Sequence, residues 1–247
     1  MGTTVCAAVS ADPELELVAA VDPAHTGTEL EGVTVSGEIG ALAEAGAEVA
    51  VDFTVRDAAV ANLAWCAAHG VHAVAGTTGF SDADLRVLGE GFPPGGPLGC
   101  VVAPNFAIGA VLMMRFAELA APWFETAEII ELHHDAKADA PSGTAMLTAE
   151  RMAAASKTWG SDPTRTEVVA GARGGVGPAG IHVHAVRLRG LVAHQEVLLG
   201  TTGQSLTVRH DSYDRSSFMP GVLLAVKAVA GGGRPGLTVG LNNLLGI

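Results

Sequence analysis

Cysteine is scarce in this sequence. Cys6, Cys66 and Cys100 are the three that it has; they lie far apart, and no two form a Cys-x-x-Cys pair. An odd and scattered set argues against a disulfide framework and against a cysteine zinc site, and favours a reducing cytoplasm. We therefore expect each thiol to be a small buried apolar side chain.

Basic residues are scarce as well. Lysine and arginine total 14 against 26 acidic residues, which gives a net charge of -12 at pH 7. A chain of this charge repels nucleic acid and anionic membrane surfaces, so neither is expected as a partner. An anionic small molecule must then be captured by a local group of cations.

Long uncharged apolar runs are also missing. The longest apolar stretch, residues 106–124, carries Arg115 and Glu118 in its middle. This pattern predicts a core or interface helix rather than a membrane span. The first residues lack the basic start and apolar run of an export signal, so we expect a cytoplasmic location.

The first half of the chain alternates short valine-rich runs with helical patterns. The predicted strands are 15–22, 47–54, 71–78 and 98–105, and the predicted helices include 56–70 and 81–91. Strands that alternate with helices indicate βαβ units and a parallel sheet covered on both faces. We predict an α/β class with a Rossmann-like doubly wound sheet.

The second half has period-2 alternation between glycine turns. Its predicted strands are 127–134, 181–190, 193–200 and 205–211, followed by a helix over 218–231. Alternation indicates an open mixed sheet in an α+β domain. We predict a dinucleotide-binding domain over 1–105, with 218–247 packing back on it, and a substrate-binding and oligomerisation domain over 106–217.

Three predicted strands of the first half end alike. Residues 52–54, 76–79 and 103–106 each change from apolar to small or polar side chains. Ligands of doubly wound sheets bind beyond the carboxyl ends of the strands, so these segments predict one shared crevice. Ordinary turn chemistry explains each segment taken alone.

Asp22 ends the first predicted strand. An acidic residue at this place hydrogen-bonds the adenosine ribose in dinucleotide-binding folds, whereas a turn or cap aspartate before Pro23 is the alternative. No lysine or arginine lies between residues 11 and 55, which favours NADH over NADPH.

A complete glycine-rich phosphate loop is not found. Asp22 follows Gly2 by about 20 residues, the spacing from the end of such a loop to the acidic residue. We therefore interpret Gly2 as the last glycine of the loop, with the first strand and the rest of the loop lacking. On this interpretation the natural product begins upstream, or its cofactor binding is impaired, and the sheet has a gap.

Cations gather in one segment, ELHHDAKADAPSGTA, residues 131–145. His133 and His134 point to opposite faces of a strand unless the strand ends between them. Pro141 is predicted to start a helix with the next three residues in its first turn, where free N–H groups bind carboxylates. With Lys137 nearby, the segment suits a small dianion, and a histidine can act as a general acid. A polar loop with an N-capping serine is the alternative.

His182 and His184 lie two apart on one predicted strand. No carboxylate or cysteine stands at ligand spacing beside them. A sheet face or interface therefore explains them better than a metal site, and we expect no metal.

Taken together, these segments resemble 4-hydroxy-tetrahydrodipicolinate reductase, also called dihydrodipicolinate reductase, of the actinobacterial type. Residues 131–145 carry the most specific resemblance, and the sequences DFT, VAGTTGF, APNFAIGAVL and GLTVGLNNLL match in order along essentially the whole chain. The resemblance implies an oxidoreductase of lysine and diaminopimelate biosynthesis. It would pass a hydride from NADH or NADPH to a cyclic imine dicarboxylate, with loss of water, and form a homotetramer through its second sheet.

The resemblance also implies roles for individual residues. His133 would be the acid/base group and Lys137 the proton donor. The substrate carboxylates would be held by His134, Ser142, Gly143 and Thr144. The cofactor would be held by Gly2, Asp22, Phe53, Thr54, Gly76, Thr77, Thr78, Ala103, Pro104, Asn105 and Phe106.

Two other readings stay open. A catalytically impaired oligomeric remnant would bind dicarboxylate and bind cofactor weakly. A related nicotinamide enzyme, such as a small amino-acid dehydrogenase, would need a different acid site from residues 131–145.

Overall fold

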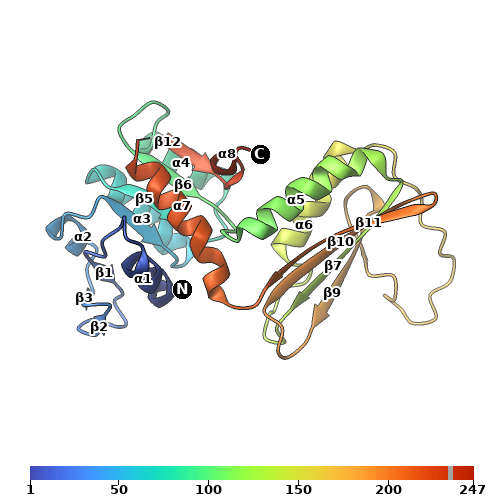
Figure 1. The fold of residues 1–247 in the computed structure, drawn as a ribbon, viewed down its shortest axis with the longest axis horizontal. Coiled ribbons are helices and arrows are strands. Elements are labelled where there is room, and N and C mark those ends of the chain that lie inside the picture. The colour runs from blue at the N-terminus through green and yellow to red at the C-terminus, as the bar shows by residue number, and fades with distance from the viewer. Residues whose placement is uncertain (233–235) are drawn as a thin grey trace. The chain divides into compact units, whose positions relative to one another are not determined.

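A computed structural model describes residues 1–232 and 236–247 and divides the chain into two compact units (Figure 1). The first unit comprises Met1–Ala107 and Arg215–Ile247, and the second comprises Ile108–Asp214. The C-terminal segment therefore belongs to the same unit as the N-terminal half.

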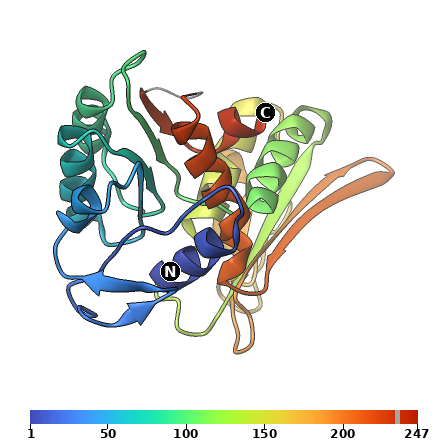
Figure 2. The same cartoon turned by 60° about the vertical axis from the view of Figure 1, so that its left-hand side comes forward.

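The first unit is built on a four-stranded parallel sheet of order β12-β6-β5-β4. Its strands are β4 (Val49–Asp52), β5 (His72–Ala75), β6 (Gly99–Val102) and β12 (Gly236–Val239). Helices α3 (Arg56–Ala68) and α4 (Asp82–Gly91) cover one face, and α7 (Met219–Ala230) covers the other (Figure 2). All four residues of β6 are buried, as expected for a strand with helices on both sides.

The core between this sheet and helices α3 and α4 contains Leu63, Phe92 and two cysteines. All three cysteines of the chain are buried and free, as predicted. Burial raises the pKa of Cys66 to about 11 and that of Cys100 to about 12, so both stay neutral thiols.

A second, small sheet holds the other strands of this unit, β1 (Ala20–Val21), β2 (Glu29–Leu30) and β3 (Val33–Ser36), in the order β1-β3-β2. Helices α1 (Gly2–Ala11) and α2 (Ala41–Glu44) precede and follow them, and α8 (Asn242–Leu245) lies near the C-terminus. Among the described residues no strand joins β1 to β4. The α/β class with a Rossmann-like parallel sheet is confirmed, with its strands divided between two sheets. The predicted strand over 15–22 was mostly wrong, because only Ala20 and Val21 find a partner strand.

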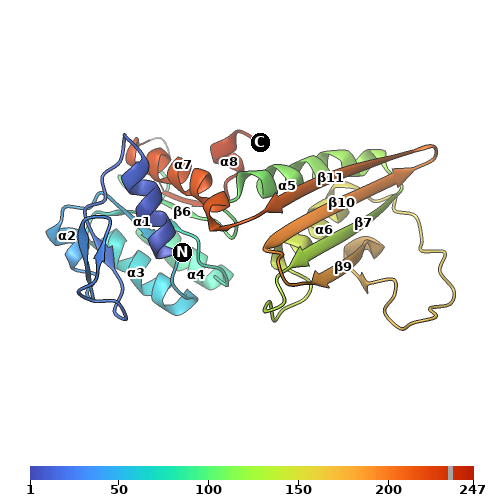
Figure 3. The ribbon, with the colours of Figure 1, turned by 60° about the horizontal axis from the view of Figure 1, so that its bottom comes forward.

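The second unit is an open mixed sheet of order β11-β10-β7-β9-β8 (Figure 3), as predicted. Its strands are β7 (Thr126–His133), β8 (Gly175–Val176), β9 (His182–Arg187), β10 (Ala193–Thr201) and β11 (Gln204–Ser212). Strands β7 and β9 are parallel, and the other pairs are antiparallel.

Two helices, α5 (Ile108–Ala120) and α6 (Gly143–Ala155), pack on the sheet of the second unit. In β7 the residues Ile129 and Glu131 are fully buried, whereas Glu128, Ile130 and Leu132 between and beside them are only half-buried. The period-2 pattern therefore follows the two faces of the sheet.

Short 3-10 helices span Ala121–Trp123, Pro178–Gly180 and Arg215–Phe218. Among the described residues, no helix combines the length and the apolar character that a membrane crossing requires.

Candidate active site

Strand β7 ends at His133, one residue before the predicted end, so His134 lies outside the strand. His133 lies on the same strand face as the buried Glu131, two residues earlier. His134 is exposed beyond the strand end, and its carbonyl accepts a hydrogen bond from the N–H of Lys137.

The His133 ring is held by the Glu131 carboxylate, with Nδ1 2.6 Å from Oε2. Burial lowers the pKa of His133 below its ordinary 6.5, against the opposing effect of Glu131, and the positive charges of Lys137 and Arg187 lower it further. The ring is therefore mostly neutral at pH 7 in the ligand-free protein.

Arg187, at the end of β9, forms the main ion pair of Glu131. Its Nη1 and Nη2 each lie 2.8 Å from a carboxylate oxygen, a two-pronged geometry that suits a fully buried carboxylate. Burial alone would raise the pKa of Glu131, but hydrogen bonds from Arg187 and His133 hold it below the ordinary value. Sequence reasoning named neither residue for the site. The one available signal was an acidic residue at a position that alternation assigns to the buried face of β7.

Lys137 lies in the loop between β7 and α6, and its ammonium pairs with a neighbour. Its Nζ lies 2.7 and 2.9 Å from the two carboxylate oxygens of Asp139. The Asp139 side chain is 65% exposed, so this is an exposed partner that a ligand carboxylate can replace at little cost.

Helix α6 begins at Gly143, and Ser142 is its N-cap. The Ser142 hydroxyl accepts from the N–H of Ala145 at 3.2 Å, so the capping alternative is correct for this serine. Pro141 lies outside the helix, contrary to the prediction, because the capping serine takes the extended backbone that precedes the first turn.

The first turn of α6 is open on one side. A Cβ built on the exposed Gly143 would meet nothing within 4 Å. Thr144 is half-buried, and its carbonyl accepts the hydroxyl of Thr148 at 2.7 Å. A helix N-terminus with open space beside it can receive a carboxylate.

In the first unit the Asp52 side chain joins the ends of β4 and β5. Its Oδ1 accepts from the N–H and hydroxyl of Thr54 and from the hydroxyl of Thr77, while Oδ2 accepts from Asn62 at 2.8 Å. Two of the predicted cofactor residues, Thr54 and Thr77, are thus brought together. Asp52, which connects them, belongs to the predicted segment 52–54 but was given no role of its own. Thr54 and Thr78 are exposed at these strand ends, and Thr77 is buried.

Phe53 covers Gly76 at the same edge of the sheet. A Cβ on Gly76 would lie 2.0 Å from the Phe53 ring, so the space that this glycine leaves is filled by Phe53 rather than open to a ligand. The Phe53 and Phe106 ring centroids are 5.9 Å apart. After β6, Ala103 is buried and Pro104 is exposed.

Asn105, also after β6, bonds its own loop: its side-chain oxygen accepts a hydrogen bond from the N–H of Ala107 at 2.9 Å. The remaining predicted cofactor residues lie in the N-terminal segment. Gly2 is exposed at the start of α1. Asp22 accepts the N–H of Ala24 and lies 2.9 Å from His25 Nδ1. These two contacts lower its pKa, so in this structure the Asp22 carboxylate also stabilises its own turn.

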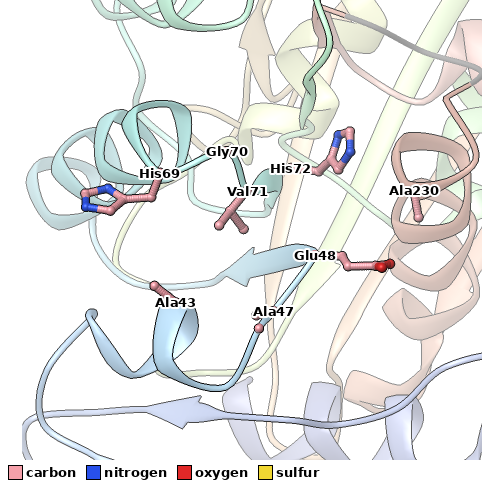
Figure 4. Close-up of a pocket in the computed structure, with 9 residues that line it drawn as sticks. Ala43, Ala47, Glu48, His69, Gly70, Val71, His72 and Ala230 are labelled. Carbon is pink, nitrogen blue, oxygen red and sulfur yellow. The ribbon is translucent and has the colours of Figure 1, made fainter.

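A cavity of about 440 Å³ lies at the opposite end of the parallel strands, between the residues that precede β4 and β5 (Figure 4). Glu48, His69 and His72 line it, but their side chains point away from one another. His72 Nδ1 accepts the N–H of Gly99, and the His69 ring stacks on Trp65. The polar side chains that line the cavity therefore do not point toward a common ligand position.

The histidines of β9 are held by a separate polar cluster. His184 Nε2 contacts Glu128, while His182 Nδ1 lies 2.7 Å from the carbonyl of Arg173. Across the described ranges, no three histidine, cysteine or acidic side chains gather as metal ligands would.

Comparisons with known proteins agree along the whole chain. Two family models match, dihydrodipicolinate reductase N-terminus over residues 1–106 and dihydrodipicolinate reductase C-terminus over 109–245. A 4-hydroxy-tetrahydrodipicolinate reductase of Cutibacterium acnes is 51% identical over an alignment of 251 residues, gaps included, that covers 100% of this chain and 95% of the relative. One of Nocardia farcinica is 53% identical over an alignment of 249 residues that covers 99% of this chain and 94% of the relative.

Solved structures give the same picture. A dipicolinate-bound dihydrodipicolinate reductase from Paenisporosarcina sp. TG-14 has a TM-score of 0.87 and 40% identity, covering 98% of this chain and 94% of that one. An amine dehydrogenase from Mycobacterium smegmatis has a TM-score of 0.53 at 13% identity, covering 96% and 91%, and shares the fold alone.

Proposed function

We propose that this chain, which belongs to the dihydrodipicolinate reductase family, reduces 4-hydroxy-tetrahydrodipicolinate to tetrahydrodipicolinate in lysine and diaminopimelate biosynthesis. The observation that carries the proposal is the junction at the end of β7. There His133 and the N-cap of α6 are both bonded to Glu131, next to the loop of Lys137.

This junction suits a ring with two carboxylates. Lys137 can exchange the exposed Asp139 for one ligand carboxylate, and the first turn of α6 at Gly143 and Thr144 can take the other. His134, exposed beside them, adds a further donor. A structural relative carries dipicolinate, a planar ring of this class, which supports the assignment.

The reduction consumes one hydride and one proton and releases water. His133 and Lys137 are the proton-exchanging groups that we assign to it. Because Nδ1 of His133 faces Glu131, the proton is exchanged at Nε2. A bound dianion favours the charged imidazole and so raises the pKa of His133 from its lowered value.

NADH or NADPH supplies the hydride when it is bound. The carboxyl ends of β4, β5 and β6 fit a nicotinamide, because the Thr54 and Thr78 side chains are exposed there, and a Cβ on Gly79 would meet nothing within 4 Å. We assign the segments at 53–54, 76–78 and 103–106 to this end of the cofactor, and Gly2 and Asp22 to the adenosine end. The contacts of Asp22 with its own turn weaken the argument for NADH over NADPH.

We further infer a homotetramer in the cytoplasm, assembled through the sheet face of the second unit that α5 and α6 leave uncovered. Ile130, Leu132 and Leu198 occupy that face and are only half-buried in one chain. Light scattering on the purified protein tests the assembly, and a monomer at micromolar concentration would contradict it.

The activity is tested by following the loss of nicotinamide absorbance with freshly prepared substrate. We expect turnover by the wild type, and a loss of about 100-fold or more for Lys137→Ala, in line with the removal of a proton donor. Lys157→Ala, which alters an exposed lysine of the same unit, is the matched control and should keep full turnover. A wild type that binds dipicolinate but never oxidises the cofactor would favour the impaired remnant instead.

A further inference from the structure

Glu131 has no unused hydrogen-bonding capacity. Oε1 accepts from the backbone N–H of Ser142 at 3.0 Å and from Arg187, and Oε2 accepts from Arg187 and lies 2.6 Å from His133 Nδ1. The side chain is fully buried, so it contacts no ligand itself. Everything it does for the reaction must pass through the groups that it holds.

The first of these groups is the imidazole. An ionised carboxylate can only accept hydrogen bonds, so the hydrogen between Glu131 and His133 belongs to Nδ1. Neutral His133 is therefore the Nδ1–H tautomer, with the lone pair on Nε2. The carboxylate thus selects the nitrogen at which the proton is exchanged.

The second group is the ligand cradle. Arg187 uses Nη2 both for Glu131 and, at 2.6 Å, for the carbonyl of Asp139, in the loop that carries Lys137. Glu131 itself anchors the N-cap of α6 through Ser142. One buried pair thus connects the acid, the lysine loop and the helix N-terminus.

We propose that Glu131 and Arg187 are positioning residues for the reduction: Glu131 sets the tautomer of His133, and the pair together holds the Lys137 loop against the first turn of α6. The inference rests on the proposed function and deepens it. Glu131 is fully buried, and Arg187 bonds Glu131 and the Asp139 carbonyl, so neither is assigned a chemical step.

Glu131→Gln separates this role from a packing role. The glutamine keeps the size and one acceptor oxygen, but its amide donates to Nδ1 and moves the histidine hydrogen to Nε2. We expect kcat to fall by about 100-fold or more, with a smaller change in the affinity for dipicolinate. The limb of the pH profile that depends on His133 should move to lower pH, because the charge that opposes the effects of burial, Lys137 and Arg187 is gone.

Arg187→Lys gives the complementary result. A lysine keeps the charge but cannot hold Glu131 with two prongs and reach the Asp139 carbonyl as well. We expect it to weaken dipicolinate binding more than it lowers kcat. Glu128→Gln is the matched control: this residue also lies on β7 and pairs with an arginine and a histidine, Arg173 and His184, yet it belongs to a different cluster. Glu128 shares the sheet face that we assign to assembly, so the comparison uses the variant in the same oligomeric state as the wild type, checked by light scattering. In that state its kcat and pH profile should equal those of the wild type.

Nitrogen NMR of the histidine rings reads the tautomer directly, with His133→Gln assigning the signal. Nδ1–H in the wild type and Nε2–H in Glu131→Gln support the proposal. Nε2–H in the wild type, or kinetics of Glu131→Gln equal to those of Glu128→Gln, overturns it. If Glu131→Gln does not fold, the wild-type tautomer and the Arg187→Lys affinity still decide. If the wild type has no turnover, the proposed function fails, while the tautomer and the dipicolinate affinities still decide on positioning.

Discussion

A methyl group added at Gly76 is expected to collide with the Phe53 ring. The Cβ of Gly76→Ala would lie 2.0, 2.4 and 2.6 Å from three ring carbons of Phe53. Carbon atoms prefer separations of about 3.5 Å or more, so the ring must retreat by more than about 1 Å. It would then lose its contact with Phe106, whose ring centroid is 5.9 Å away.

The cost of this collision can be placed within limits. Overpacking costs about 1–3 kcal/mol, and because Phe53 is only half-buried and can turn toward solvent, we expect about 1–2 kcal/mol. Alanine also restricts the unfolded chain, which returns about 0.4–1 kcal/mol where the backbone tolerates it. Gly76→Ala should therefore destabilise the protein by up to about 1.6 kcal/mol, the largest difference between these two effects.

The sign should reverse when the ring is absent. In a Phe53→Ala background the added methyl meets no ring, so Gly76→Ala should stabilise by about 0.4–1 kcal/mol. Urea unfolding of the four proteins of this cycle, compared at equal m-values, measures the coupling. Displacement of the ring toward the strand ends should also weaken NADH binding by Gly76→Ala.

Additive effects in this cycle would refute the reasoning. Equal destabilisation by Gly76→Ala with and without the Phe53 ring would mean that the backbone, not the ring, requires glycine at this position.

Three further predictions follow from single contacts. Gly143→Ala should not lower the melting temperature and should slightly raise it, because its Cβ meets nothing and alanine restricts the unfolded chain, yet it should raise KM for the substrate; an unchanged KM would remove the first turn of α6 from the site. Gly221→Ala should lower the melting temperature without touching that site, because its Cβ would lie 2.1 Å from the backbone oxygen of Phe106; an unchanged melting curve would contradict this contact. Hydrogen bonds from Arg56 first, and then those at the cap of α4, lower the pKa of Asp84 from 3.8 to about 2. Its contribution to stability is therefore present above pH 3.8 and lost as pH falls through about 2, so the stability difference between wild type and Asp84→Asn should shrink over that range; a difference independent of pH would contradict it.

Local patterns predicted the elements that have a neighbour to pair with. The valine-rich runs ending at Asp52, Ala75 and Val102 are strands because each lies beside another parallel strand. The run over 15–22 has a similar composition but forms only a two-residue strand, because pairing is a tertiary property that composition does not contain.

The sequence predicted those residues of the candidate site that lie at the end of β7 and in the loop and helix start after it. His133, Lys137 and the first turn of α6 lie within one short segment, and their charge stands out in an acidic chain. The buried parts were not predictable from that segment. Arg187 meets Glu131 only through the parallel register of β7 and β9, in which Glu131 lies opposite Ala185.

Two glycines of the candidate site have different surroundings. At Gly76, at the end of β5, the Phe53 ring fills the space beside the backbone. At Gly143 the space is open. The same residue type thus serves packing at one site and access at another, and only the neighbouring side chains distinguish the two.

The alternation along β7 places the site residues and the buried apolar residues on the same face of the strand. Glu131 and His133 share their face with Ile129, and the pairing of Glu131 with Gln195 on β10 keeps them there. A shift of one residue in this pairing would turn the carboxylate away from α6 and bring Leu132 in its place. Misaligned folding of this sheet would therefore separate Glu131 from its partners even if the strands still assembled. If His133 exchanges the proton as we propose, turnover then depends on correct strand pairing.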